Sequence, residues 1–149
     1  MRPAGAMREP DAMSTVIVAA AVVKHEGRIL LTRRMAGAHL AGMWELPGGK
    51  VEAGEDPEAA VVRECAEECA IDVIVDDIVD VTFHRYAGTD AKPGKDVLLL
   101  FYACRLGARR DVQHLGVADH TWARPSELRN YPLPPPDEKL VRKLEKTGD

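Results

Sequence analysis

The order of strand-type and helix-type segments along the chain limits the folds that it can adopt. Runs rich in Val, Ile, Phe and Tyr predict strands over 16–23, 28–32, 71–86 and 96–105, with a further short strand around Trp122. Turn residues at 25–27 and a polar stretch at 88–95 join these runs into two hairpins. Helical patterns at 57–69 and 137–146 interrupt and end the series. This mixed order predicts an α/β domain.

The segment 57–69 carries the clearest helix signal. Asp56 is a good N-cap residue and Pro57 suits the first turn, and apolar residues then recur at helical spacing. The preceding Pro47-Gly48-Gly49 run punctuates the backbone and predicts a loop before the helix. A loop followed by a helix is therefore expected near the middle of the chain.

Three carboxylates project from one side of this predicted helix. Glu64, Glu67 and Glu68 stand at positions i, i+3 and i+4, and each like-charged pair costs an isolated helix about 0.2–0.5 kcal/mol. A bound divalent cation would reverse that penalty, and hard cations such as Mg²⁺ take oxygen ligands. Arg63 can pair with Glu67 one turn on and hold it in place. The alternative is an ordinary solvated helix face, because Glu is a common exposed helix former.

The glutamates belong to a longer spaced pattern. The chain fits G-x5-E-x7-R-E-x2-E-E with Gly49, Glu55, Arg63, Glu64, Glu67 and Glu68. With average residue usage, six fixed positions match by chance about 10⁻⁵ times over a chain of this length. The spacing therefore indicates a functional site.

These residues resemble the signature of the Nudix family, G-x5-E-x7-R-E-U-x-E-E-x-G-U, where U is a bulky aliphatic residue. The match runs from Gly49 to Ile71, with two departures. Cys65 replaces an aliphatic residue and Ala70 replaces the final glycine. If the helix ends in a left-handed turn, a non-glycine residue there costs about 1 kcal/mol.

The resemblance implies a Nudix α/β/α sandwich, with a mixed β-sheet and the signature as a loop-helix-loop. It also implies that Mg²⁺, or alternatively Mn²⁺, is coordinated by Glu64, Glu67 and Glu68 together with a backbone carbonyl near Gly49. Glu55 and Arg63 would be the supporting pair. Any of the three glutamates could act as the general base that accepts a proton from the attacking water.

The wider chain resembles the MutT-like branch through 31–34, 44–50, Trp122 and 133–138. That branch cuts nucleoside triphosphates to a monophosphate and pyrophosphate, or removes oxidised guanine nucleotides. The resemblance implies substrate contacts from Arg34, His39, Gly48, Gly49, Lys50 and Asp137. Asp137 would read the base edge, or it would simply N-cap the terminal helix. His120 is either a substrate contact or a surface histidine.

The length, net charge and cysteine content of the chain limit the kinds of ligand that it can bind. The 149 residues suffice for one domain, expected over 14–149, with residues 1–13 as a disordered tail or residues added during cloning. A net charge of −4 argues against duplex nucleic acid as a ligand, and no apolar run is long enough to span a bilayer. Three cysteines without CxxC spacing predict no disulfides and a cytoplasmic location. We expect a monomer or homodimer that binds a small nucleotide.

Two rival interpretations remain open at the level of sequence. One is another Nudix substrate class, such as diadenosine polyphosphates, ADP-ribose, an RNA 5′ end or a pyrimidine nucleotide, with Tyr86 stacking on a base. The other is a non-catalytic nucleotide-binding module, since fold alone does not guarantee function.

Overall fold

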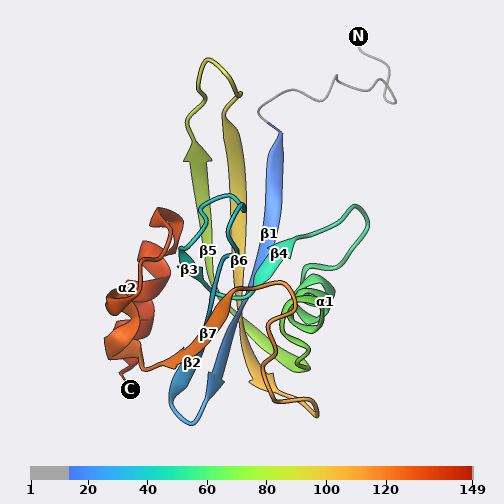
Figure 1. Ribbon diagram of the computed structural model, residues 1–149, viewed down its shortest axis with the longest axis vertical. Helices are drawn as coiled ribbons and strands as arrows, with labels where there is room; N and C mark the ends of the chain where they lie inside the picture. Colours follow the sequence, from blue (N-terminus) through green and yellow to red (C-terminus); the bar gives the residue numbers. More distant parts are fainter. Residues whose placement is uncertain (1–13, 149) are drawn as a thin grey trace.

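A computed structural model describes residues 14–148 (Figure 1). The expected tail at 1–13 and the final Asp149 lie outside the described residues. The strands are β1 (Thr15–His25), β2 (Arg28–Arg33), β3 (Trp44–Glu45), β4 (Gly48–Lys50), β5 (Val73–Tyr86), β6 (Lys95–Leu106) and β7 (Asp119–Ala123). The helices are α1 (Pro57–Cys69) and α2 (Glu138–Thr147), with 3₁₀ segments η1 (Pro125–Asn130) and η2 (Pro135–Asp137).

The seven strands form one mixed sheet. The main order is β3-β2-β1-β6-β5, with β4 paired to β1 and β7 paired to β2. β1 runs parallel to β6 over nine residue pairs from Thr15↔Asp96 to Val23↔Cys104, whereas the β1–β2 and β5–β6 pairs are antiparallel hairpins. Both predicted hairpins and the α/β class are confirmed.

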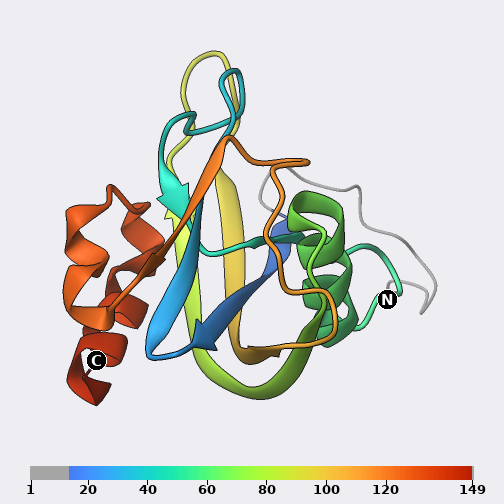
Figure 2. The ribbon, with the colours of Figure 1, turned by 60° about the horizontal axis from the view of Figure 1, so that its bottom comes forward.

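Helices cover the two faces of this sheet (Figures 1 and 2). Alternate residues of β1 point to opposite faces. Ala19, Ala21 and Val23 pack in a core with Val61 and other residues of α1, and Ala20 and Val22 pack in a second core with residues of α2. Because the central strand is buried on both faces, its sequence is an apolar run without alternation. The predicted sandwich is confirmed.

Local signals set the ends of α1. The Asp56 side chain accepts a hydrogen bond from the Glu58 backbone N–H at 2.8 Å, and Pro57 occupies the first turn. Ala70 ends the helix in the left-handed region, at φ 55° and ψ 32°, and its N–H donates to the Ala66 carbonyl. The helix thus begins and ends where its sequence predicts, with an alanine in a conformation that favours glycine.

The segment expected as a plain loop before α1 contains a strand. Gly48, Gly49 and Lys50 form β4 and pair with Ala20, Ala19 and Val18 of β1. A Cβ on residue 48 would lie 2.3 Å from the Ala19 carbonyl oxygen, so only glycine allows this close pairing. The pairing is non-local, which is why the turn-type residues alone did not predict it.

α2 closes the second face through Leu140, Val141 and Leu144, which are buried. Two lysines of its outer side reach β5. Lys139 and Lys143 donate from Nζ to the carbonyl oxygens of Val81 and Val79, each at 2.6 Å. β5 is the last strand in the sheet order, so these ammonium groups cover part of a sheet edge.

Among residues 14–148, neither α1 nor α2 is long and apolar enough to cross a membrane.

Candidate active site

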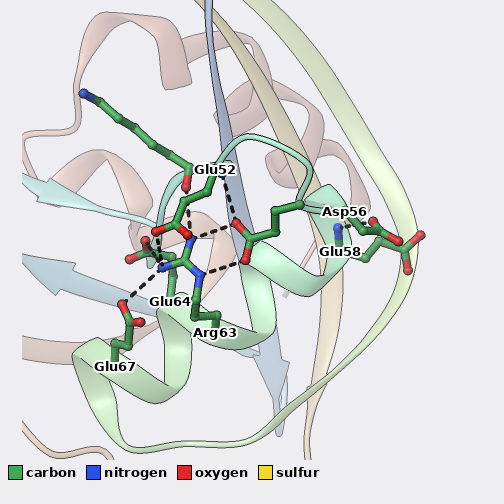
Figure 3. Close-up of polar contacts among 8 residues, drawn as sticks. Glu52, Asp56, Glu58, Arg63, Glu64 and Glu67 are labelled. Atoms are coloured by element: carbon green, nitrogen blue, oxygen red, sulfur yellow. Dashed lines mark hydrogen bonds and ion pairs between the residues drawn. The ribbon is translucent and has the colours of Figure 1, made fainter.

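The Arg63 guanidinium gathers the carboxylates that flank it on α1 (Figure 3). Its Nη1 lies 2.9 Å from Glu64 Oε1 and 3.2 Å from Glu67 Oε2. Its Nη2 also donates to the Lys50 carbonyl at 3.1 Å, which ties α1 to β4. The side chain of Glu64 is 17% exposed and that of Glu67 is 59% exposed. The two glutamates therefore share the Arg63 guanidinium but differ in their exposure to water.

Glu55 completes this arrangement. Its carboxylate accepts from Arg63 Nε at 2.8 Å and from Nη2 at 2.9 Å, a bidentate ion pair. These hydrogen bonds lower the pKa of Glu55 to about 2, so the pair stays charged across the physiological range. The expected Glu55–Arg63 and Arg63–Glu67 pairings are present. Together these ion pairs hold the charged side chains of α1 in an orientation that faces β4.

The Glu68 side chain points into the protein, where it lies next to Glu64. Its Oε1 atom is buried and has no hydrogen-bond partner among the described residues. Burial, together with the negative charges of Glu45 and Glu64, raises its pKa to about 8. An ionised carboxylate in this position needs a compensating cation.

Gly49 allows Glu64 to lie directly against the β4 backbone. A Cβ at residue 49 would be 2.5 Å from the carboxyl carbon of Glu64 and 2.6 Å from its Oε1. A side chain at residue 49 would push the Glu64 carboxylate out of this position. The glycine of the spaced pattern is thus required by close approach of a carboxylate to the main chain.

A cavity of about 350 Å³ opens beside these groups. Its lining includes all six residues expected to contact substrate, which are Arg34, His39, Gly48, Gly49, Lys50 and Asp137. Glu68 also lines the cavity. These six residues come from three separate parts of the chain, which are the segment after β2, strand β4 and the end of η2. Of the three glutamates expected to bind metal, only Glu68 lines this cavity, while Glu64 lies next to Gly49 and Glu67 stays in the Arg63 cluster.

Charges of both signs line the cavity. Arg34 forms an ion pair with Glu45 across the β2–β3 connection at 2.5 Å. Burial, together with the positive charges of Lys50 and Arg34, lowers the pKa of Lys95. Burial also raises the pKa of Glu45, despite the opposing effect of Arg34. Basic and acidic side chains thus share the cavity, which suits a ligand that brings both phosphate and a cation.

Asp137 is a buried carboxyl in the wall of this cavity, with 5% of its surface exposed. Burial raises its pKa to about 7, and the negative charge of Glu45 adds to the shift. Although it precedes α2, its side chain makes no capping hydrogen bond within residues 14–148. The N-cap interpretation is therefore wrong, because this side chain faces the cavity and the 3₁₀ turn η2 supplies the start of the helix.

Two aromatic residues left open by the sequence have different surroundings. Tyr86 lines the cavity and contacts the His39 ring edge-on at 5.9 Å between centroids. His120 is absent from the cavity lining. Its Nδ1 atom instead lies 2.8 Å from the Nε2 atom of His114. Of these two, only Tyr86 is placed to touch a ligand in the cavity.

Sequence reasoning missed several lining residues. Val97, Leu99 and Phe101 of β6 form an apolar wall, and Glu45 and Lys95 add charges. The alternation of Val97, Leu99 and Phe101 along one strand face was a usable signal. No local signal marks Lys95, since its place depends on the parallel pairing of β6 with β1.

The donor set fits a hard divalent cation. Glu64 and Glu68 offer carboxylate oxygens, and the Glu68 Oε1 atom lacks a partner among the described residues. The β4 backbone approaches Glu64 within the distance that only glycine permits. Oxygen ligands from one or two carboxylates, with the remaining positions left to phosphate and water, are what Mg²⁺ uses in proteins.

Comparison with known proteins agrees with this geometry. Residues 13–144 match the NUDIX domain family. The chain is 31% identical over 133 residues to CTP pyrophosphohydrolase of Escherichia coli (strain K12), covering 87% of this chain and 90% of that protein. It is 32% identical over 128 residues to an 8-oxo-dGTP diphosphatase of Haemophilus influenzae, covering 85% of this chain and 89% of that protein.

A solved structure shares the fold. The crystal structure of a MutT NUDIX hydrolase from Burkholderia pseudomallei superposes with a TM-score of 0.70 at 28% identity, covering 88% of this chain and 98% of that one. The chain belongs to the Nudix hydrolase family, which confirms the resemblance drawn from Gly49–Ile71 and the MutT-like branch. It is accordingly an enzyme of the pyrophosphohydrolase class.

Proposed function

We propose that this enzyme uses Mg²⁺ to hydrolyse a nucleoside triphosphate to the monophosphate and pyrophosphate. The observation that carries the proposal is one cavity lined by a carboxylate with a buried, unpartnered oxygen (Glu68 Oε1), three basic side chains (Arg34, Lys50, Lys95) and a buried carboxyl (Asp137). A triphosphate nucleotide is a ligand that needs all three kinds of group at once.

Glu64 and Glu68, with Glu67, would hold the ion. When bound, Mg²⁺ neutralises phosphate charge and makes water a better nucleophile. The glutamates divide two tasks, which are holding the cation and accepting the proton of the attacking water. Arg63 and Glu55 position Glu64 and Glu67 through the hydrogen bonds described above. Arg34, Lys50 and Lys95 bind the phosphate oxygens that the ion does not contact.

The base would lie against the apolar wall of β6, with Asp137 and Tyr86 at its edge. Leu99 and Phe101 supply apolar surface there, and Asp137 supplies hydrogen bonds. The two similar proteins are named for different bases, CTP and 8-oxo-dGTP, so both belong in the substrate test. We propose a small nucleotide as the ligand, the cytoplasm as the setting, and a monomer or homodimer as the form.

The test is a panel of nucleotides incubated with the full chain and Mg²⁺, with products identified by chromatography. The panel includes CTP, dGTP, 8-oxo-dGTP, ADP-ribose and a diadenosine polyphosphate. We expect a triphosphate to give monophosphate and pyrophosphate in equal amounts, with no reaction when Mg²⁺ and Mn²⁺ are absent. Release of a nucleoside diphosphate and orthophosphate, or faster turnover of ADP-ribose, would contradict the proposal.

A substitution at Glu68 tests the site itself. Glu68→Gln should lower kcat by about 10²-fold or more, since it removes an oxygen charge from the metal and proton site. Glu58→Gln is the matched control, because Glu58 is an exposed glutamate in the first turn of the same helix. The control should keep parental kcat, and circular dichroism should match for all three proteins. Full activity in Glu68→Gln would remove this residue from the mechanism.

A further inference from the structure

A second cluster of metal-ligating side chains lies outside the cavity, where the segment after β6 enters β7. His114 Nε2 and His120 Nδ1 are 2.8 Å apart, and their ring centroids are separated by 5.0 Å. Asp119 Oδ1 is 3.9 Å from His114 Nε2 and accepts a hydrogen bond from the His120 backbone N–H at 2.8 Å. One ligand atom from each residue can be chosen so that all three lie within 4.8 Å of one another.

Two imidazole nitrogens at hydrogen-bond distance share a single proton, because one must donate and the other accept. A metal ion that binds both nitrogens displaces this proton, which moves through solvent to the other ring nitrogen of the histidine that carried it, so both imidazoles are neutral ligands. Two imidazoles and one carboxylate are a donor set for Zn²⁺ and similar transition ions, whereas Mg²⁺ prefers oxygen alone.

We propose that His114, Asp119 and His120 form a binding site for a transition-metal ion such as Zn²⁺. The site is separate from the carboxylates of α1 and does not depend on the proposed function. Three protein ligands leave one tetrahedral position for water.

The site is accessible and can adjust. The side chains of His114 and Asp119 are 40% and 45% exposed, so an ion can reach them from solvent. Zn–N bonds of about 2.0–2.1 Å at tetrahedral angles set two nitrogens about 3.4 Å apart, so the rings must separate by about 0.6 Å. The cysteines do not compete, because Cys65, Cys69 and Cys104 are buried and burial raises the pKa of each thiol.

An ion here would restrain a segment that touches the α1 glutamates. The backbone N–H groups of Leu115 and Gly116 both donate to the Glu68 carbonyl at 3.0 Å, and Figure 2 shows the segment running beside α1. Joining His114 to His120 of β7 closes the stretch between them into a short loop. The metal would thus hold Leu115 and Gly116 against Glu68 from the opposite side of the segment.

The experiment titrates chelator-treated full-length protein with Co²⁺, read by visible absorption, and then displaces Co²⁺ with Zn²⁺. The same titration is repeated in a glutamine background, the double variant Glu64→Gln, Glu68→Gln, which weakens competing metal binding at the α1 carboxylates. We expect one equivalent of Co²⁺ to bind, with a d–d band and without a thiolate charge-transfer band. Zn²⁺ should bind at least tenfold more weakly after His114→Ala or Asp119→Asn. His25→Ala is the matched control, since His25 is a partly exposed histidine at the end of β1; it should bind as the parent does.

Circular dichroism checks that each variant folds, and His114→Ala decides the test if His120→Ala does not fold, because His114 is exposed. Parental Zn²⁺ affinity in folded His114→Ala and Asp119→Asn would overturn the proposal. Loss of the bound equivalent in the glutamine background alone would also overturn it, because the ion would then belong to the α1 carboxylates.

Discussion

Asp137 shows how the environment of one residue can tune recognition. A carboxyl with a pKa of about 7 is protonated below neutral pH and can then donate one hydrogen bond while accepting another. Above neutral pH it only accepts. Guanine presents the acceptors O6 and N7 at one edge, so a protonated Asp137 can donate to one of them, whereas an ionised Asp137 can donate to neither.

This residue predicts a pH-dependent affinity. Between pH 6 and pH 8 we expect KM for dGTP to rise by about fivefold in the parent, as one neutral donor is lost. Asp137→Asn keeps a donor at every pH and should remove most of that change. The measurement is KM for dGTP at both pH values, with CTP as the comparison substrate. An equal rise in the asparagine variant would assign the effect to another group.

At the scale of elements, the end of α1 carries a measurable cost. Ala70 sits at φ 55°, a region that glycine enters freely and alanine does not. Ala70→Gly should therefore stabilise the protein by about 0.5–1 kcal/mol, even though glycine makes the unfolded chain more flexible. Thermal denaturation should show a Tm higher by about 2–4 °C per kcal/mol.

The matched control for this substitution is in the same helix. Ala59→Gly places glycine at an exposed position in the first turn of α1 and should destabilise by about 0.5–1 kcal/mol. Opposite signs for the two alanine-to-glycine changes would confirm that backbone conformation decides the effect. A lower Tm for Ala70→Gly would mean that the left-handed cap is not strained in solution.

Elements that depend on nearby residues were predictable from the sequence. The bounds of α1 followed from Asp56, Pro57 and the spacing of its apolar residues, and the hairpins followed from strand and turn composition. β4 was missed because its pairing with β1 brings together residues about 30 positions apart. Pairing between strands that are separated in sequence also hid Glu45 and Lys95, whose places in the cavity depend on how β3 and β6 join the sheet.

At the scale of the whole molecule, buried acids link stability to pH. The folded-state pKa values of Glu68 and Asp137, about 8 and about 7, exceed their ordinary values. The folded protein therefore binds protons more tightly than the unfolded chain, and stability rises as pH falls through 8 and 7. Above pH 8 both buried charges are present and the stabilisation is lost.

We expect the metal-free protein to melt about 5–10 °C higher at pH 6.5 than at pH 8.5, because the two raised pKa values together amount to about 2.5 kcal/mol of linkage. Glu68→Gln should reduce this difference, since the amide does not titrate. Millimolar Mg²⁺ should raise Tm most at pH 8.5, because it binds only the folded state and offsets the buried charge. Differential scanning calorimetry measures each case. A Tm that is equal at both pH values, or unchanged by Mg²⁺ with a nucleotide present, would contradict the assignment of these carboxylates.

The lysines on the outer side of α2 affect how copies of this molecule meet. β5 ends the sheet and exposes Ile74, Ile78, Val81 and Phe83, a surface that favours intermolecular strand pairing. Lys139 and Lys143 already use two of its carbonyl oxygens, so an incoming strand would have to displace two ammonium groups and meet their charge. Fibrillar growth from folded molecules is opposed at this edge by a helix that has no part in the proposed chemistry.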